Sequence, residues 1–316
     1  MTVRHYLRLS RAGLAPFTAL SWVVGAGTAT EFVLMGAGGL LLHAYACKVN
    51  DLADLDADRW APARRDSPLV TGAVTPLRVT WWVLVELLVL AAGCAALPRD
   101  RWTAAGLLAV LVLTTWGNLF QKRSRAVSPL VVDHLFGIAV AAPLALGGGP
   151  VPLAIALWLH MVILNVTVGG IKDLDVDVRA RARTSVQVLG VRRVDGRLIR
   201  PPLYQTYVLA VQAASAAALF MVGPVPFTLA IASTGALVTA LHRQPRDVRT
   251  TVRRVLREAG FVVGNAAAFL AGVLVVMPPR WGVPAVAVVV TAIAWTAWRR
   301  SAGQHASSPH HQHTER

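Results

Sequence analysis

Two short segments of the chain carry Asp residues at helical spacing. In the first segment, at 100° per residue, one face of a helix carries an amide and three carboxylates, and Asp56 points away from that face. The residues on the shared face are Asn50, Asp51, Asp54 and Asp58. We therefore expect three carboxylates to converge on one side of this segment.

The second segment repeats this pattern about 120 residues further along the chain. Asp173 and Asp177 are i,i+4 neighbours on a helix, Asp175 lies off their face, and Lys172 precedes them. Two more carboxylates are thus expected to share a face, next to a cation.

Carboxylates packed this closely repel and raise one another's pKa unless a cation neutralises them. A hard divalent ion is suited to this task, since Mg²⁺ takes one or two carboxylates together with substrate phosphates. Each segment is also followed by arginines, which bind phosphate oxygens and stabilise a departing pyrophosphate. These arginines are Arg59, Arg64 and Arg65, and then Arg179, Arg181 and Arg183. A diphosphate substrate fits this pattern better than the alternative, two solvated loops in which Asp balances Arg.

The composition places both segments in a membrane protein. Hydrophobic residues make up 55% of the 316 residues, charged residues 15%, and the mean hydropathy is +0.54. A soluble domain has about 25% charged residues, so this chain has too little charge to cover a surface in water. The chain has only two cysteines, Cys47 and Cys94, both in apolar runs, and two cysteines cannot build a disulfide framework or a four-thiolate metal site.

Apolar runs long enough to cross a bilayer predict ten membrane spans, with nine almost as well supported because the first run is the weakest. Both Asp segments fall where a span ends. The runs are 14–30, 32–49, 77–97, 102–120, 130–147, 152–171, 204–222, 224–242, 259–277 and 282–298.

The loops on one side of this arrangement carry 28 of the 31 Lys and Arg residues, and the loops on the other side carry three. Positive charge is retained on the cytoplasmic side of a membrane. We therefore expect a protein of the plasma membrane with both termini and both Asp segments on the cytoplasmic side. This topology also accounts for the net charge of +15, which in a soluble protein would suggest nucleic acid. We expect no nucleic-acid partner.

At these residues the chain resembles the UbiA superfamily of intramembrane prenyltransferases. The first motif of that superfamily, Asn-Asp-x-x-Asp-x-x-x-Asp, is matched in full. Its second motif, Asp-x-x-x-Asp followed by a basic residue and Ser or Thr, is matched by Asp173, Asp177, Arg183 and Thr184. One departure is Gly170, where many members carry a further Asp on the same helical face. The second metal site would then be short of one carboxylate, or the glycine would leave space for a substrate.

The resemblance implies an all-α bundle of nine or ten spans around a central cavity, with cap loops on the cytoplasmic side, over residues 1–300. Residues 301–316 are expected to be a disordered polar tail that contains histidines. The implied reaction is Mg²⁺-assisted ionisation of a polyprenyl diphosphate and transfer of the prenyl group to an aromatic or other small acceptor. The implied metal ligands and catalytic residues are Asp51, Asp54, Asp58, Asp173 and Asp177, and the implied substrate-binding residues are Asn50, Arg59, Lys122, Lys172, Arg11 and Arg8.

Two other functions remain open at this point. A cyclase of the same fold would capture the cation with the substrate's own double bonds. A transporter would use paired Asp residues to coordinate a moving cation, although transport sites usually lie near the midplane of the membrane and not at one face. Glu86, a carboxylate in the middle of the third run, is a further candidate for contact with the acceptor or the cation.

Overall fold

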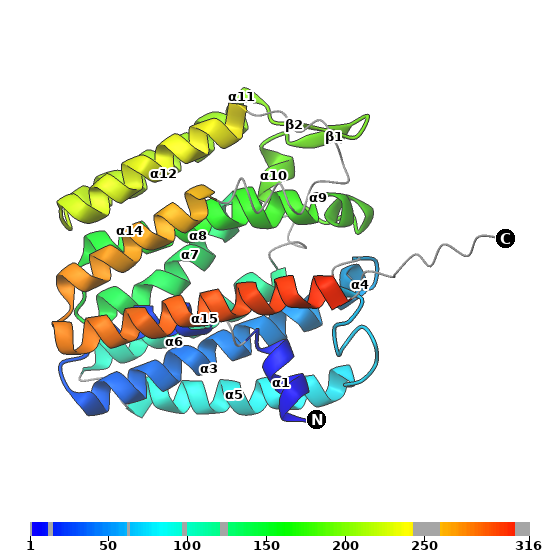
Figure 1. Cartoon of the computed structure of the whole chain (residues 1–316). Coiled ribbons are helices and arrows are strands. Elements are labelled where there is room, and N and C mark those ends of the chain that lie inside the picture. Colours follow the sequence, from blue (N-terminus) through cyan, green and yellow to red (C-terminus); the bar gives the residue numbers. More distant parts are fainter. Residues whose placement is uncertain are drawn as a thin grey trace.

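The computed structural model describes residues 2–11, 15–61, 64–96, 100–120, 126–242 and 260–306. Long helices run side by side between the two ends of a bundle, which confirms the expected all-α fold class (Figure 1). The apolar helices are α2 (Ala15–Val23), α3 (Ala29–Ala53), α5 (Pro76–Ala96), α6 (Arg101–Phe120), α7 (Pro129–Leu146), α8 (Val151–Leu164), α11 (Pro202–Phe220), α12 (Pro224–His242), α14 (Gly260–Val276) and α15 (Pro279–Ala306).

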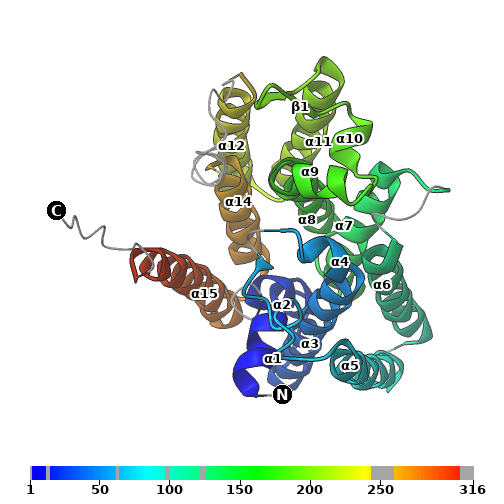
Figure 2. The ribbon, with the colours of Figure 1, turned by 90° about the vertical axis from the view of Figure 1, so that its right-hand side faces the viewer.

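The short elements gather at one end of the bundle, on the right of Figure 1, which we call the polar end. Figure 2 looks onto this end, with α15 at the periphery beside α2 and α14. The elements of the polar end are α1 (Val3–Leu9), α4 (Leu55–Asp58), α9 (Gly170–Arg179), α10 (Ser185–Val188), β1 (Arg192–Val194) and β2 (Arg197–Ile199).

The expected count of nine or ten spans is not confirmed. In the described part of the chain, seven helices are long and apolar enough to cross a membrane: α3, α5, α6, α7, the continuous helix of Val151–Arg179, α11 and α12. Gly260–Val276 and Pro279–Trp295 are apolar but shorter. Helix α2 has only nine residues, about 14 Å in length, against a hydrocarbon core of about 30 Å.

The chain around α2 nevertheless passes from one end of the bundle to the other. Arg11 contacts Asp51 at the polar end, whereas a Cβ on Gly25 would lie 1.7 Å from the carbonyl oxygen of Gly147 at the C-terminus of α7. This close approach requires a glycine. The alternation of loops between the two ends, on which the charge count depends, is therefore kept although α2 itself is short.

Helix ends far from the polar end are capped by the residues that begin them. Thr28 and Glu31 form a reciprocal capping box at the start of α3. Asp100 accepts hydrogen bonds from the backbone N–H groups of Trp102 and Thr103 at the start of α6, and these bonds lower the pKa of its carboxyl. Such caps fix where the apolar helices begin.

The core lies between α2, α7, α8, α11 and α14. Leu144, Leu153, Leu157, Ala268 and Val273 are fully buried there, in a cluster that extends to α12 and α15. A second buried apolar cluster joins α8, α9, α10, α11 and α12 near the polar end, so the charged residues of that end lie beside apolar packing.

A small hairpin was not expected in the all-α interpretation. Strands β1 and β2 pair antiparallel, with Arg192 opposite Ile199. The turn residues Asp195 and Gly196 have φ values of 47° and 75°, the conformation that an Asp-Gly turn favours. The Asp-Gly pair between Arg-Arg-Val and Arg-Leu-Ile was the available sequence signal for this hairpin.

The expected boundary at residue 300 falls inside a helix. Helix α15 continues to Ala306, because adding residues to an existing helix costs little and Ser, Ala and Gln are compatible with it. The rest of the expected polar tail, residues 307–316, lies outside the described residues.

The predicted orientation can be tested with single cysteines at exposed positions of the two ends. Arg192→Cys lies in the hairpin of the polar end, and Val151→Cys lies at the opposite end, at the start of α8. In intact cells a membrane-impermeant maleimide should label Val151→Cys and leave Arg192→Cys unlabelled. Permeabilised cells should label both, while the native Cys47 and Cys94 are buried and give little background. The opposite pattern in intact cells would contradict the orientation.

Candidate functional site

The two Asp segments line one cavity of about 270 Å³ at the polar end of the bundle. One side of this cavity carries Asn50, Asp54 and Asp58, and the other side carries Lys172, Asp173 and Asp177. Segments more than 100 residues apart in the sequence therefore share one site.

The first segment is not one continuous helix. Helix α3 ends at Ala53, Asp54 leaves helical geometry with φ −93° and ψ 4°, and α4 follows. The backbone N–H of Asp54 still donates to the Asn50 carbonyl at 2.8 Å, and that of Asp58 donates to the Asp54 carbonyl at 2.8 Å. The i,i+4 register thus continues across the break, which keeps these three residues on the cavity.

Asp56 lies off the cavity, as the helical spacing predicted. Its side chain is 90% exposed and pairs with Arg59 at 3.2 Å. Arg59 is itself exposed and does not line the cavity, so the structure separates this predicted substrate-binding residue from the others.

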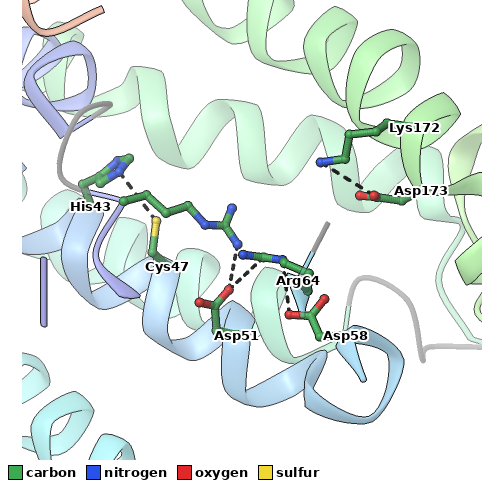
Figure 3. Close-up of polar contacts among 8 residues, drawn as sticks. His43, Cys47, Asp51, Asp58, Arg64, Lys172 and Asp173 are labelled. Carbon is green, nitrogen blue, oxygen red and sulfur yellow. Dashed lines mark hydrogen bonds and ion pairs between the residues drawn. The ribbon is translucent and has the colours of Figure 1, made fainter. Parts of the chain in front are cut away.

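Asp51 is buried and holds two guanidinium groups. Its Oδ1 accepts from Nη2 of Arg11 at 2.7 Å and from Nη2 of Arg64 at 3.0 Å, and Nε of Arg64 lies 3.4 Å from Oδ2 of Asp58. Figure 3 shows Arg64 between Asp51 and Asp58, with Lys172 and Asp173 facing them from the other side. Burial lowers the pKa of Arg11, but the nearby acids, chiefly Asp51, outweigh this and raise it, so Arg11 stays charged.

Arg64 was named with the arginines that follow the first segment, but it was not among the substrate-binding residues that the family resemblance implied. It follows Asp51 by 13 residues and comes from the loop beyond α4, so helical periodicity could not connect the two. Its signal was the presence of several arginines after the first Asp segment.

The second segment lies on a helix with a π turn. The helix is continuous over Val151–Arg179, with π geometry at Asn165–Gly169 directly before α9. Such turns are frequent at functional sites, and Asn165 lines the cavity here. Asp173 lies 3.6 Å from the Nζ of Lys172, and Asp177 is 1% exposed. Asp175 points away and pairs with Nε of Arg193 at 3.0 Å.

Helix α7 adds a carboxylate that the predicted site did not contain. Asp133 is buried, lines the same cavity, and accepts a hydrogen bond of 2.5 Å from the hydroxyl of Ser185 at the start of α10. Sequence alone indicated only a polar residue where a span begins, because nothing in the spacing connects α7 with α10.

Gly170 lines the cavity together with Asp173 and Asp177, but the space for a side chain there is filled. A Cβ on Gly170 would lie 2.3 Å from Cγ2 of Val186, which is 1% exposed. Helix α10 packs onto α9 at this glycine. A carboxylate at position 170 would have to displace a buried, branched side chain.

The remaining predicted residues lie elsewhere. Arg8 is exposed, donates to the backbone carbonyl of Asp66 at 2.6 Å, and does not line the cavity. Lys122 lies outside the described residues. Glu86 does not line the cavity that the two Asp segments share, and it pairs with Lys48 at 2.9 Å, so the structure does not place it beside the other predicted site residues.

The donors around the cavity suit Mg²⁺. They are carboxylate and amide oxygens, which hard cations prefer, and the neighbouring guanidinium groups can bind phosphate oxygens. Among the described residues, no three His, Cys, Asp or Glu side chains form a compact metal cage. Mg²⁺ usually takes one or two carboxylates and completes its shell with water and substrate phosphates.

The fold and this cavity define an integral membrane protein with a site of carboxylates and guanidinium groups at one end of its helices. Residues 13–254 match the family model described as the UbiA prenyltransferase family, and the chain belongs to this family.

Among curated proteins the chain is similar to 4-hydroxybenzoate octaprenyltransferases. It is 28% identical over 181 residues to that of Acidovorax ebreus, covering 55% of this chain and 61% of the relative. The enzyme of Paraburkholderia phytofirmans is 28% identical over 203 residues, covering 58% and 68%. The chain thus spans less than two thirds of the first of these relatives.

Two solved structures share the fold. A UbiA homolog from Aeropyrum pernix K1 aligns with a TM-score of 0.61 at 19% identity, covering 87% of this chain and 98% of that one. A UbiA homolog from Archaeoglobus fulgidus bound to GPP and Mg²⁺ aligns with a TM-score of 0.58 at 16% identity, covering 84% and 99%.

The packing of Gly170 against Val186 predicts that any side chain at this position destabilises the protein. Gly170→Ala and Gly170→Asp should both lower the thermal midpoint in detergent, because overpacking lowers the free energy of unfolding by about 1–3 kcal/mol. Adding Val186→Ala should recover part of the loss for Gly170→Ala.

Gly169→Ala is the matched control, because the nearest atom to its Cβ lies at 3.6 Å, an ordinary contact. A Gly170→Asp protein as stable as the unsubstituted one, with tighter Mg²⁺ binding, would instead favour the idea that this position only lacks a carboxylate.

Proposed function

We propose that the protein transfers a prenyl group from a prenyl diphosphate to a small, aromatic acceptor. The observation that carries this proposal is the single cavity at the polar end, in which two carboxylate segments face each other beside Arg11 and Arg64. Membership of the UbiA prenyltransferase family supports the reaction class, and the 4-hydroxybenzoate octaprenyltransferases support an aromatic acceptor.

In this proposal Arg11, Arg64 and Lys172 bind the diphosphate, each as a cation at the edge of the cavity. Asn50 adds an amide that can donate a hydrogen bond to a phosphate oxygen. Asp51 keeps Arg11 and Arg64 together. The positions of Arg8 and Arg59 give neither a direct part in binding, and Lys122 stays a prediction.

Asp54, Asp58, Asp173 and Asp177 would hold Mg²⁺ from the two sides of the cavity. When bound, the ion neutralises charge that develops on the leaving diphosphate. The protein's cations add to this effect as the allylic carbon–oxygen bond breaks and its electron pair leaves with the diphosphate. The acceptor then supplies the electron pair for the new bond to carbon and loses a proton.

The proposal also covers the location and orientation of the protein in the membrane. We place the cavity on the cytoplasmic side of the plasma membrane, with both termini on that side, because soluble diphosphates and most of the basic residues would lie there. The prenyl chain would extend from the cavity toward the apolar part of the bundle.

The function can be tested with purified protein in lipid nanodiscs. Incubation with labelled prenyl diphosphates of different length, Mg²⁺ and 4-hydroxybenzoate should release pyrophosphate and give a prenylated acceptor. EDTA should stop the reaction and added Mg²⁺ should restore it. Release of a cyclic hydrocarbon without acceptor would indicate the cyclase alternative, and no consumption of any prenyl diphosphate would contradict the proposal.

The same Asp→Asn change at different positions separates cavity residues from exposed ones. Asp54→Asn and Asp177→Asn should each lower kcat by about 10²-fold or more, because each removes a carboxylate that would hold the Mg²⁺ ion beside the leaving group. Asp56→Asn should leave kcat unchanged, since Asp56 is exposed and off the cavity. Initial rates at saturating substrate provide the measurement, and equal losses for all three would contradict the site.

A further inference from the structure

We propose that a buried ion pair between Lys48 and Glu86, together with Tyr6 and Ser10, is a positioning device that fixes α1 so that Arg11 reaches the diphosphate. This inference rests on the proposed function, because it assigns a role to residues that act through Arg11. It makes Lys48, Glu86, Tyr6 and Ser10 positioning residues that do not contact the substrate.

The first observation is the depth of the ion pair. Lys48 on α3 is fully buried, and its Nζ lies 2.9 Å from Oε1 of Glu86 on α5. Removing two charges from water is costly for each ion, and their mutual attraction offsets that cost only in part. Ionisable residues within spans are rare and usually functional, yet neither side chain lines the cavity. Their role must therefore pass through other residues.

The second observation is what the ion pair holds. The hydroxyl of Tyr6 donates to Oε1 of Glu86 at 2.5 Å, and the ring of Tyr6 lies 4.2 Å from the Nζ of Lys48. Burial and Glu86 raise the pKa of Tyr6, so its hydroxyl stays protonated and acts as the donor. Lys48 also donates to Oγ of Ser10 at 3.1 Å. The pair thus holds α1 and the residue that follows it.

The third observation is the geometry of the next residue. Arg11 has φ 44°, in the left-handed region, which is unfavourable for a non-glycine residue and persists where neighbouring contacts fix it. Two contacts with α3 fix this part of the chain. Lys48 donates to Ser10, and Arg11 donates to Asp51, which lies three residues after Lys48 on α3. One turn of α3 therefore holds both residues and directs the Arg11 side chain into the cavity.

The experiment is a double-mutant cycle with inorganic pyrophosphate as the probe. The network variant is Tyr6→Phe with Ser10→Ala, which keeps the buried charges paired and so avoids an unpaired lysine. We expect it to raise the inhibition constant of pyrophosphate and the KM for the prenyl diphosphate about threefold to tenfold, the ratio that one hydrogen bond corresponds to, with little change in kcat. In an Arg11→Ala background the same two substitutions should change neither constant.

The matched control is Tyr45→Phe. Tyr45 is also on α3, is buried, and loses a hydrogen bond of 2.6 Å to Thr115 that has no connection to α1. Its pyrophosphate inhibition constant should equal that of the unsubstituted protein. Size-exclusion profiles and thermal midpoints identify any variant that fails to fold, and for such a variant Tyr6→Phe alone replaces the pair in the cycle.

Two outcomes would overturn the inference. A folded network variant that binds pyrophosphate normally would show that α1 does not position Arg11, and an equal shift in the Arg11→Ala background would show that the network acts on the fold in general. If the unsubstituted protein neither binds pyrophosphate nor consumes prenyl diphosphate, the proposed function fails as well. Normal turnover with unshifted variants contradicts only the positioning role.

Discussion

The site depends on one buried oxygen, Oδ1 of Asp51, which accepts from both Arg11 and Arg64. Two guanidinium groups brought together in a partly buried cavity would repel each other, and a shared carboxylate offsets that repulsion. Because Arg11 follows α1 and Arg64 follows α4, this one contact also joins two separate parts of the chain at the polar end. Removing Asp51 would therefore remove the ion pair of Arg11 with this carboxylate and leave Arg64 with Asp58 alone.

The sequence of helix α3 must both pack in the apolar bundle and carry charged residues of the site at its C-terminal end. Its apolar part packs in the bundle, its last turns carry Lys48 and Asp51, and Asp54 directly follows its last residue. Charged groups at this depth are tolerated only when each has a partner, and here the partners come from α1, α5 and the loop after α4. The break at Asp54 adds a second helix without changing the i,i+4 contacts, so Asp58 stays on the cavity. The residues at the C-terminal end of this span thus also belong to the site or to its supporting contacts.

Helical periodicity predicted those features that depend on one segment alone. Asp54 and Asp58 on the cavity, and Asp56 and Asp175 off it, follow from 100° per residue and the structure agrees, whereas Asp51, expected on the same face, does not line the cavity. Long apolar runs likewise predicted the helices, although α2 has only nine residues and is followed by Gly25, which lies against Gly147 at the end of α7. Arg64 and Asp133 could not be found in this way, because contacts between distant segments leave no period in the sequence.

The sequence around Gly170 does not by itself show how the neighbouring helix α10 packs against this position. In isolation, the glycine on the face of Asp173 and Asp177 indicates a missing carboxylate or an open space. In the folded chain Val186 fills that space, and the packing of α10 that puts Val186 there also brings the neighbouring Ser185 onto Asp133. The cavity therefore has three carboxylates on this side, Asp133, Asp173 and Asp177, of which one comes from α7. The absence of a side chain at position 170 is what allows α10 to lie close enough for that contact, so the glycine and the α7 carboxylate belong to one arrangement.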